Sequence, residues 1–540
     1  MFRKLRFLAL LGMAIAVLDF HFVFPCPARE IDLTILHTAD LHGHLDSVPV
    51  EGSTEQAGGL LRCAAVIDRA RAEAANVVLV DCGDLFQGSA ESFLSGGEAV
   101  MRAVTYLRYD GLVVGNHEFD WGVDRLRALY RKADIPVLSA GITVPEKDAL
   151  PHACPFIVKQ FEGIKLVVVG LSNPSIPNWS RPRLLDDLRF ADSVDALRGV
   201  MPEVRALEPD ILVLAVHQGW RQWGDDRANE VNRIARTFPD FDLIIGAHTH
   251  TAVEGAEVNR IIYTQAGYYG LWLGKVSLTF DDRKRQVTRI KPQLIAVGAD
   301  VPPDEKLQEL VAEPLRAARA YLGRKVGASA RELGVVEKSP GQSEVQTLIA
   351  AAIAGSAGAD VVFHGALTTA GLPRGILRMA DVWRIVPYEN TLARARLTLE
   401  EIREVLEENS KYYGKTQFRG VYGLTYELNR KAVAGRRVSN LQLDDHRELK
   451  ENERISFAVN SYDLASAGGR FPRLREIMER PGSKLEETDK DTREAVIDYL
   501  KRNSPLDIQA APGVVVAKSR RKGTETHRDK VRMKEAEIAR

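Results

Sequence analysis

The sequence has few cysteines and no excess of charge of either sign. It contains 4 cysteines among 540 residues, and Lys plus Arg equal Asp plus Glu at 73 each. Cys63, Cys82 and Cys154 are the cysteines that follow the N-terminal segment, so a disulfide framework is excluded and at most one bridge can form. Their spacing fits no cysteine metal site, and we interpret them as small buried apolar residues. The balanced charge offers no basic surface, so no nucleic-acid partner is expected.

The sequence also lacks an apolar run long enough for a stable membrane span. Basic residues within positions 1–6 precede an apolar run from Phe7 to Leu18, which is shorter than the ~20 residues that a membrane-spanning helix needs. A basic start, a short apolar core and the small or polar exit at 25–28 are typical of a secretory signal, assigned here to residues 1–29. This predicts an exported protein, periplasmic or extracellular. The alternative is an uncleaved N-terminus that tethers the protein to a membrane.

What the sequence does contain is a series of short apolar runs separated by helical patterns. Examples are Val77–Val80, Ile211–Val216 and Leu243–Ile245, with a helical pattern at 60–75. Runs that are apolar on both faces predict buried strands covered by helices or by a second sheet, which is an α/β fold. We assign residues 30–298 to one such domain.

A break follows the first domain. Pro302 and Pro303 interrupt the chain, and Asp304 is suited to cap a helix that runs to about Tyr321, so residues 299–325 are assigned as a linker helix. Residues 326–515 form a second domain, which opens with a helix of small residues at 343–357. The tail at 516–540 is charged and poor in apolar residues, which predicts disorder or a lone charged helix.

Side chains that bind divalent metals follow five apolar runs of the first domain, at the point where each run ends. They are Asp40, His42, Asp84, Asn116, His217, His248 and His250. Because strand ends converge on one edge of an open α/β sheet, we expect these side chains around one cavity. Carboxylate, amide and imidazole groups suit Mn²⁺, Fe²⁺, Zn²⁺ or Co²⁺, and no thiolate is offered.

This set of ligands is too large for one ion but suffices for two if one carboxylate bridges them. Two metals about 3.5–4 Å apart would clamp the attacking and departing oxygens of an in-line displacement at phosphorus, with a shared hydroxide as the nucleophile. The sequence therefore predicts a hydrolase of phosphate esters that holds two divalent ions, whose identity these ligands do not fix.

The individual motifs differ in specificity. The pairs around Asp40 and Asp84 occur by chance in many loops, and a lone His217 after a strand is more often a buried histidine than a ligand. The segment from Asn116 to Asp120 is far more specific, because four functional groups crowd one turn after a buried strand. The ordered set at successive strand ends is more specific than any member.

The ordered motifs resemble those of the calcineurin-like metallophosphoesterases, which carry Asp-x-His, Gly-Asp, Gly-Asn-His-Glu, His and Gly-His-x-His in this order. The fuller form at 115–120, with Gly58-Gly59 and Gln87-Gly88, is similar to the secreted 5′-nucleotidase branch, which includes UDP-sugar hydrolases and ecto-5′-nucleotidases. The resemblance covers nearly all of the chain after the N-terminal segment. It implies a four-layer β-sandwich flanked by helices, followed by a second α/β domain that binds the substrate.

The resemblance also implies a role for each residue. One metal would be held by Asp40, His42, Asp84 and His250, and the other by Asp84, Asn116, His217 and His248. Asp84 would bridge the two ions. His117 would not bind metal; it would stabilise charge on the phosphoryl group and protonate the leaving oxygen, with Asp120 orienting its ring.

In the second domain, the resemblance places a nucleotide base between two aromatic rings. Phe418 and Phe471 stand at those positions, and Asn116 is counted as a substrate contact as well as a metal ligand. From composition alone both phenylalanines would be core residues; the neighbouring Gly and Arg residues favour exposure. A stacked base contributes about 1–3 kcal/mol per aromatic ring and tolerates any base.

The second domain departs from the family pattern at one important position. A substrate-binding arginine is expected after the strand that ends at Phe363, but the chain reads Gly365-Ala366-Leu367-Thr368 there. The nearby arginines at 374, 378, 419 and 470 are candidates to replace it.

Three readings of the function remain. The first is an exported nucleotide phosphohydrolase, with UDP-sugar or 2′,3′-cyclic-nucleotide hydrolysis included. The second keeps the chemistry but acts on a non-nucleotide phosphoester, or on a sulfur ester, against which the intact Asn-His-Glu motif argues. The third is a non-catalytic binding protein that retains the fold, although no metal ligand is visibly lost.

Overall fold

The computed structural model describes residues 29–50, 55–144, 150–450 and 452–516. The predicted secretory segment and the predicted charged tail therefore lie outside the described residues, apart from one residue each, Arg29 and Val516. Across the described ranges, no helix has both the length and the apolar character needed to cross a membrane.

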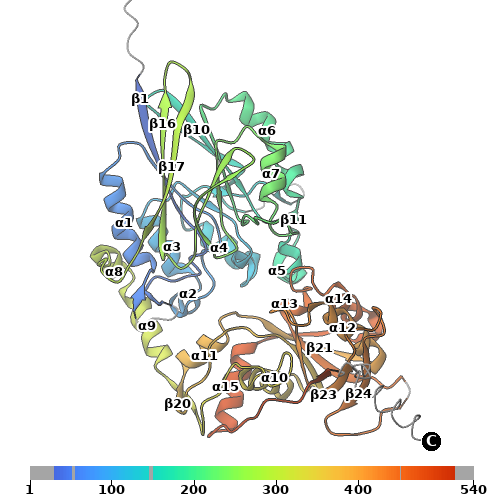
Figure 1. The fold of residues 1–540 in the computed structure, drawn as a ribbon. Helices are drawn as coiled ribbons and strands as arrows, with labels where there is room; N and C mark the ends of the chain where they lie inside the picture. Colours follow the sequence, from blue (N-terminus) through green and yellow to red (C-terminus); the bar gives the residue numbers. More distant parts are fainter. Residues whose placement is uncertain (1–28, 51–54, 145–149, 451, 517–540) are drawn as a thin grey trace, which may run out of the picture.

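The N-terminal half contains two facing sheets (Figure 1). The first has, in spatial order, β17 (Gln286–Ala296), β16 (Trp272–Asp281), β1 (Glu30–Thr38), β4 (Val77–Asp81), β5 (Gly111–Val113), β6 (Val137–Leu138) and β8 (Ala153–Cys154). The second has β14 (Ala252–Val258), β15 (Ile261–Ala266), β13 (Leu243–Gly246), β12 (Ile211–Val216), β10 (Ile164–Leu171) and β9 (Phe156–Phe161). Strands β1, β4 and β5 run parallel, as do β12 and β13, so their carboxyl ends point the same way.

Alternating side chains of these strands divide the interior into layers. Ile31, Leu33 and Ile35 of β1 point into a core between the two sheets, whereas Leu36 packs on the opposite face against helices. That outer face of the first sheet is covered by α1 (Leu60–Ala72), α3 (Glu98–Tyr106) and α4 (Val123–Tyr130). The second sheet is covered by α6 (Ser193–Ala206) and α7 (Val231–Thr237). Successive side chains of a strand point to opposite faces of its sheet. Each sheet therefore packs against the other sheet on one face and against helices on the other, which gives a helix–sheet–sheet–helix sandwich.

A pair of consecutive helices connects the two halves of the chain. The expected single helix after Asp304 is divided at Val311 into α8 (Glu305–Leu310) and α9 (Ala312–Leu322). The Asp304 carboxylate accepts a hydrogen bond from Leu307 N at 2.6 Å, which caps α8. α8 contributes Leu307 to the core of the first domain, and α9 contributes Leu315 to that core and Ala318 to the core of the second domain.

The C-terminal half is built around one mixed sheet. Its strands lie in the order β22 (Gly420–Tyr422), β19 (Val361–His364), β25 (Ile455–Asn460), β21 (Thr391–Leu397) and β26 (Glu486–Asp491). One face packs against α10 (Glu344–Ala357), α11 (Met379–Ile385) and α15 (Thr492–Arg502), the other against α12 (Leu399–Asn409) and α14 (Pro472–Glu479). A small sheet of β24 (Val438–Leu443), β23 (Leu424–Leu428) and β27 (Val514–Val516) adjoins it.

Side-chain caps fix where the helices of this second half begin. Ser343 and Gln346 form a reciprocal capping box at the start of α10, and Thr398 and Glu401 do the same at α12. The fold class predicted from the sequence is confirmed: a helix-flanked β-sandwich is followed by a second α/β domain.

Candidate metal centre and active site

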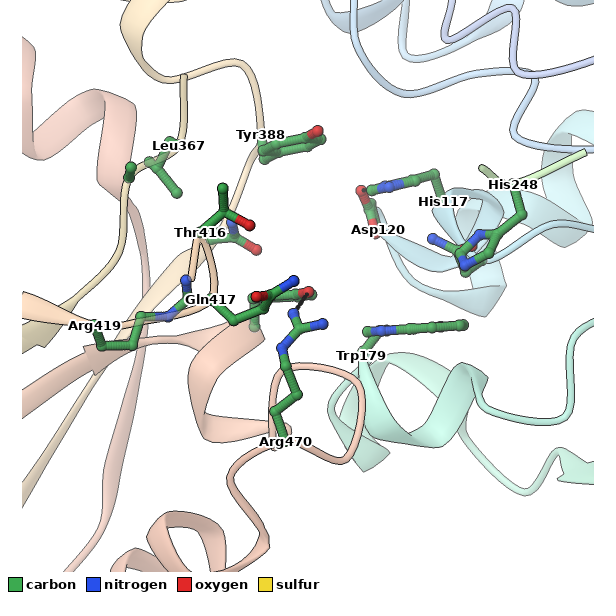
Figure 2. A pocket seen from close by; sticks show the side chains of 14 residues that line it. His117, Asp120, Trp179, His248, Leu367, Tyr388, Thr416, Gln417, Arg419 and Arg470 are labelled. Carbon is green, nitrogen blue, oxygen red and sulfur yellow. Dashed lines mark hydrogen bonds and ion pairs between the residues drawn. The ribbon is translucent and has the colours of Figure 1, made fainter. Parts of the chain in front are cut away.

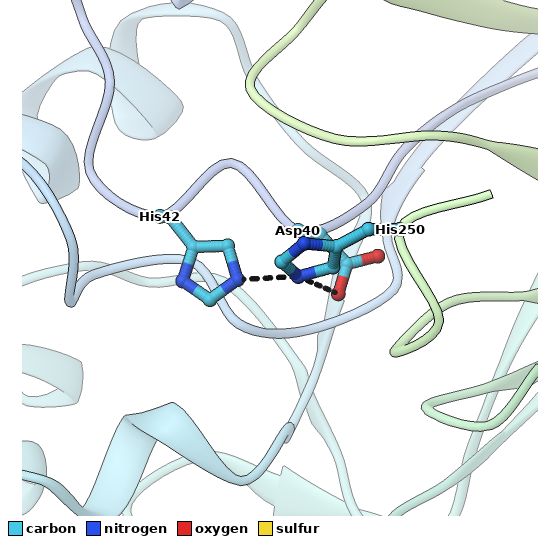
Figure 3. Close-up of side chains that lie close together, drawn as sticks. All are labelled: Asp40, His42 and His250. Atoms are coloured by element: carbon cyan, nitrogen blue, oxygen red, sulfur yellow. Dashed lines mark hydrogen bonds and ion pairs between the residues drawn. The ribbon is translucent and has the colours of Figure 1, made fainter. Parts of the chain in front are cut away.

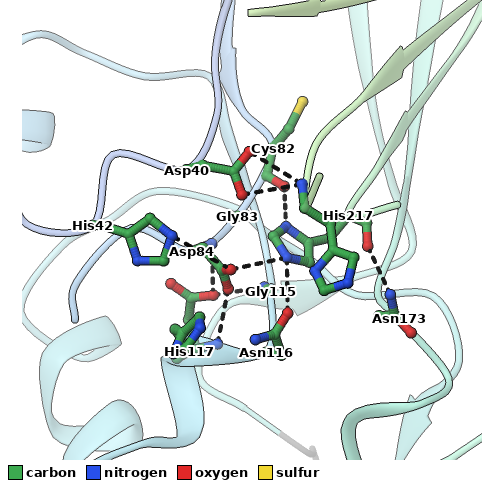
Figure 4. A network of polar contacts seen from close by, with 12 residues as sticks. Asp40, His42, Cys82, Gly83, Asp84, Gly115, Asn116, His117, Asn173 and His217 are labelled. Carbon is green, nitrogen blue, oxygen red and sulfur yellow. Dashed lines mark hydrogen bonds and ion pairs between the residues drawn. The ribbon is translucent and has the colours of Figure 1, made fainter. Parts of the chain in front are cut away.

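The predicted metal ligands all lie at the carboxyl ends of strands along one edge of the sandwich. They follow β1, β4 and β5 of the first sheet and β12 and β13 of the second. Figure 4 shows five of them, Asp40, His42, Asp84, Asn116 and His217, gathered in one network. Residues separated by about two hundred positions thereby face one another, as the sequence analysis expected from the convergence of strand ends.

One group of possible metal ligands comes from the loops that follow β1 and β13. Asp40, His42 and His250 each offer a ligand atom, and these atoms lie within 4.8 Å of one another. His42 Nε2 is 2.9 Å from His250 Nε2, which is 3.6 Å from Asp40 Oδ1 (Figure 3).

A second group contains Asp84, His217 and His248, again with ligand atoms within 4.8 Å of one another. His217 Nε2 lies 3.2 Å from Asp84 Oδ2 and 3.1 Å from Asn116 Oδ1. Asp84 Oδ2 is also 3.8 Å from His42 Nε2, so this carboxylate stands between the two groups. That is the position a bridging carboxylate would need. His42, Asp84 and His117 form a third combination within the same distance limit.

The orientation of two imidazoles fits metal binding. His42 Nδ1 donates to the carbonyl of Gln87 and His217 Nδ1 to the carbonyl of Cys82, each at 2.8 Å. Because a carbonyl only accepts, each Nδ1 carries a hydrogen and each Nε2 points towards the carboxylates, where it can bind a metal ion in exchange for its proton. Imidazole nitrogens and carboxylates facing one another in a buried cluster fit divalent cations.

The backbone at these ligands is strained. Asp40, His42, Asp84, His248 and His250 all adopt positive φ, between 47° and 71°. Non-glycine residues in this region cost about 1–2 kcal/mol each, and such strain is usually found where function requires an unfavourable local geometry. Five such residues gathered at one edge favour a functional role for this cluster.

Two glycines permit the close approach of the loops. A Cβ on Gly83 would lie 2.7 Å from His217 Nδ1, and one on Gly115 would lie 2.3 Å from Asp84 Oδ1. Both distances are shorter than any side chain tolerates, so the Gly-Asp and Gly-Asn motifs need glycine for steric reasons.

The two buried carboxylates have opposite electrostatic environments. Burial raises the pKa of Asp40 well above its usual value. Burial also acts to raise the pKa of Asp84, but the positive charges of His217 and His117 outweigh it and hold this pKa well below its usual value. Asp84 is thus the carboxylate most firmly kept ionised, which suits its central position.

His117 and Asp120 form a directed pair beside the metal ligands. His117 Nδ1 lies 2.7 Å from Asp120 Oδ2, and the backbone N–H of His117 donates to Asp84 Oδ1 at 2.8 Å. Burial acts to lower the pKa of His117, but the charges of Asp120 and Asp84 outweigh it and raise this pKa to about 10. The ring is therefore a cation that can donate from Nε2 at neutral pH.

Glu118 connects two of the ligand-bearing loops, a role that the sequence analysis did not assign. Its Oε2 accepts hydrogen bonds from the backbone N–H of Asp84 at 3.0 Å and of Gly115 at 2.6 Å, and its Oε1 accepts from Leu85 N at 2.6 Å. This side chain is buried and fixes the loop after β4 to the loop after β5.

A cavity of about 390 Å³ opens between the two domains at this edge (Figure 2). The N-terminal domain contributes Asn116, His117, Asp120, Trp179 and His248, and the C-terminal domain contributes Ala366, Leu367, Tyr388, Asn390, Thr416, Gln417, Arg419, Tyr462 and Arg470. The rings of His117 and Tyr388 are stacked, with centroids 5.7 Å apart. A ligand in this cavity would contact both domains.

The predicted stacking role of Phe418 and Phe471 is wrong in this arrangement. Both rings are buried in the core of the C-terminal domain, at 6% and 0% exposure, and neither lines the cavity. Phe471 packs edge-on against Phe363 and Tyr412, at centroid distances of 5.3 and 5.4 Å. The neighbouring glycines 468 and 469 have φ of 74° and 77°, so they serve the turn and do not expose the ring.

Of the four arginines considered as substitutes for the missing one, only two lie at the cavity. Arg419 and Arg470 line it, whereas Arg374 lines a separate surface hollow and Arg378 donates to the carbonyl of Gly323. Tyr388 belongs to a segment that matched the family, but Trp179 and Tyr462 carried no signal in the sequence, because nothing local distinguishes a cavity-lining aromatic from a core one.

Comparisons with known families match both halves of the chain. Residues 33–252 match the calcineurin-like phosphoesterase family, and residues 325–476 match the 5′-nucleotidase C-terminal domain.

Individual relatives cover most of the chain at low identity. Endonuclease YhcR of Bacillus subtilis is 23% identical over 88% of this chain, but the chain spans only 40% of that relative's length. Protein UshA of Yersinia enterocolitica is 24% identical, and the alignment covers 89% of this chain and 92% of UshA. The structure of a 5′-nucleotidase precursor from Thermus thermophilus superposes with a TM-score of 0.72 at 23% identity, covering 90% of this chain and 99% of that one.

The fold and the donor cluster define a two-domain protein of the metallophosphoesterase class. The two family matches define it further: the chain belongs to the 5′-nucleotidase branch of the calcineurin-like phosphoesterases.

Proposed function

We propose that this protein is an exported phosphoester hydrolase that uses two divalent metal ions and releases phosphate from nucleotides. The observation that carries the proposal is one shared edge, where the seven proposed metal ligands lie beside the His117–Asp120 pair at one cavity. A non-catalytic descendant would be expected to have lost at least one of these groups.

Each protein group has a defined task in this proposal. Asp40, His42 and His250 would hold one ion and Asn116, His217 and His248 the other, with Asp84 shared. When bound, such a pair polarises the phosphoryl oxygens and provides an activated nucleophile, a task that Mn²⁺, Zn²⁺, Co²⁺ or Fe²⁺ fulfils.

His117 acts beside the metal ligands. Its cationic ring, held by Asp120, stabilises the charge that grows on the phosphoryl oxygens and donates the Nε2 proton to the leaving oxygen. Groups of this kind contribute about 10²–10⁴-fold to the rate.

A nucleotide is the proposed substrate because the cavity is large enough for a nucleoside beside the metal ligands and is lined by aromatic and amide side chains. Tyr388, Tyr462 and Trp179 offer ring surfaces, and Asn390 and Gln417 offer donors and acceptors. The family to which the chain belongs supports the same assignment.

A second candidate is hydrolysis of a non-nucleotide phosphoester by the same chemistry. It is favoured by one observation: the two phenylalanines expected to hold a base are in the core, so the cavity lacks that pair. Activity that is equal on sugar phosphates and on nucleotides would support this candidate.

Export is proposed from the N-terminal sequence. A basic start followed by the apolar run Phe7 to Leu18 is the pattern of a secretory signal. Fractionation of cells that express the full chain tests this: recovery in the cytoplasm at full length would contradict it.

The proposed activity is tested with purified protein stripped by a chelator and reloaded with Mn²⁺, Zn²⁺ or Co²⁺. The panel contains nucleoside mono-, di- and triphosphates, UDP-glucose, cyclic nucleotides, sugar phosphates and p-nitrophenyl phosphate. We expect two metal ions per chain by elemental analysis and turnover only after reloading.

Two variants make the test specific. Asp84→Asn should lose metal and turnover together, whereas Asp300→Asn, at an exposed aspartate outside the site, should lose neither. Protein that holds two ions but turns over no phosphoester in the panel would be the non-catalytic binding protein, and the proposed activity would be wrong.

A further inference from the structure

The loop after α13 (Ser461–Leu464) has an unusual backbone where it reaches the cavity. Four consecutive residues, Ser466, Ala467, Gly468 and Gly469, adopt left-handed φ values of 84°, 48°, 74° and 77°. Ser466 and Ala467 are buried non-glycine residues, so this shape is unfavourable locally and is maintained by the contacts around it.

Contacts from both domains hold this loop in place. Gly469 N donates to Ser466 Oγ at 3.1 Å within the loop, and Gly468 N donates to the carbonyl of Asn178 in the N-terminal domain at 2.9 Å. A Cβ on Gly468 would lie 2.5 Å from Trp179 Nε1, so the loop is pressed against the opposite domain. The residue that follows is thereby fixed at the domain boundary.

That residue is Arg470, which lines the cavity on the C-terminal side (Figure 2). Its Nη2 donates to the hydroxyl of Tyr462, while its Nε is buried and has no hydrogen-bond partner. Among the described residues, no carboxylate forms an ion pair with it. Its positive charge is therefore not neutralised by the protein.

Arg419, the second arginine on the C-terminal side of the cavity, already has a carboxylate partner. Arg419 Nε donates to Asp463 Oδ1 at 2.9 Å, and both side chains are buried. On the opposite wall, Asp120 is paired with His117. Arg470 is thus the cavity cation left to bind an anion supplied by a ligand.

We propose that Arg470 is a specificity-determining residue that binds a second anionic group of the substrate, on the C-terminal wall of the cavity that faces His117 and His248. This rests on the proposed phosphoester hydrolysis. The reacting phosphoryl group is taken by the metal ligands and His117, so Arg470 selects phosphoesters that carry a further negative charge. Nucleoside diphosphates are the class that fits, because a guanidinium binds phosphate oxygens through two parallel hydrogen bonds.

The test compares ADP, AMP, 2-phosphoglycolate and p-nitrophenyl phosphate in wild-type protein and in Arg470→Met, Arg470→Lys and Arg470→Gln. We expect Arg470→Met to raise KM for ADP by about 10-fold to 100-fold, with kcat within about twofold, because one charge-assisted interaction is lost. KM for p-nitrophenyl phosphate, which has no second anionic group, should stay within about twofold. Arg470→Lys should recover part of the loss.

Arg374→Met is the matched control, because Arg374 is an exposed arginine of the same domain outside the cavity. It should change no KM. Each variant is first compared with wild type by thermal unfolding, and Arg470→Gln replaces the methionine variant if the latter unfolds early.

Several outcomes would overturn the inference while leaving the hydrolase intact. Equal rises in KM for AMP and ADP would make Arg470 a contact of the nucleoside and not of a second anion. A rise in KM for p-nitrophenyl phosphate of the same size would make it a general phosphoryl contact. A larger effect on 2-phosphoglycolate than on ADP would make the second anion a carboxylate. Absence of turnover on every compound by wild-type protein would instead contradict the proposed function itself.

Discussion

The guanidinium of Arg181 lies buried between the two domains, where its Nη2 donates a hydrogen bond to Glu487 Oε1 at 3.0 Å. Its Nη1 donates to Glu479 Oε1 at 2.8 Å, so one side chain of the N-terminal domain binds two carboxylates of the C-terminal domain. Both domains line the cavity, so a contact that holds the domains together also helps to fix the shape of the cavity.

Arg181→Met is expected to destabilise the protein by about 1–2 kcal/mol, because the buried cation that joins two carboxylates is lost, while Arg183 and Arg475 still pair with them. Urea unfolding measures the change. Arg198→Met is the control: Arg198 pairs with Asp195 at 3.0 Å, but both side chains are exposed, at 64% and 66%. The control should change stability by less than about 0.5 kcal/mol. An equal change in the free energy of unfolding in the two variants would show that the Arg181 contact between the domains does not contribute to stability.

Glu118→Gln should weaken metal binding without removing a predicted ligand. The carboxylate accepts three backbone N–H groups from the loops that carry Asp84 and Asn116, and an amide group cannot accept at both ends. Loss of such supporting bonds typically lowers metal affinity or activity by about 10-fold to 100-fold. Calorimetric titration with Mn²⁺ measures the affinity, and activity should recover at high Mn²⁺. Glu98→Gln is the control, at a carboxylate that is 40% exposed and pairs with Lys132 and Arg125. Unchanged affinity in Glu118→Gln would refute this positioning role.

His117→Ala should lower kcat by about 10²–10⁴-fold while the metal content stays at the wild-type value. Asp120→Asn should give a smaller loss, because the ring stays but loses the carboxylate 2.7 Å from its Nδ1. Steady-state kinetics and elemental analysis of the same preparations provide the two measurements. A His117→Ala protein with the wild-type rate would end the assignment of His117 as the acid, and one without metal would make His117 a ligand.

His364 should make the protein sensitive to acid. The ring is buried in β19 without a hydrogen-bond partner, and burial lowers its pKa from 6.5 to about 3. Between these values the unfolded chain binds a proton that the folded protein does not, so stability falls as pH falls from about 6.5 towards 3. One such proton changes the free energy of unfolding by at most about 1.4 kcal/mol per pH unit.

His364→Asn should therefore reduce the dependence of unfolding free energy on pH, measured by urea unfolding at several pH values between 4 and 7. His446→Asn, at an exposed histidine of the same domain, should leave that dependence unchanged. If His364→Asn has the wild-type slope, this buried ring does not contribute to acid sensitivity.

Much of the fold and most of the candidate site could be predicted from the sequence for local reasons. Strands such as β4 and β12 are short apolar runs, and Asp84 and His217 follow them directly, so pattern and spacing place these ligands at strand ends. The turn from Asn116 to Asp120 carries its functional groups within one segment of chain. The division of the linker helix at Val311, by contrast, has no clear signal in the sequence.

What the sequence alone determined was therefore the set of proposed metal ligands, because short apolar runs predict buried strands and the carboxyl ends of such strands meet at one edge. What only the tertiary structure decided was the substrate side of the cavity. Phe418 and Phe471 are hydrophobic residues next to glycines in the sequence, and only packing shows that the core buries their rings. Arg419 and Arg470 are both arginines of the second domain, and the sequence does not distinguish their charge states. Only the tertiary structure places Asp463 beside Arg419, because ion pairing depends on contacts between segments that are distant along the chain.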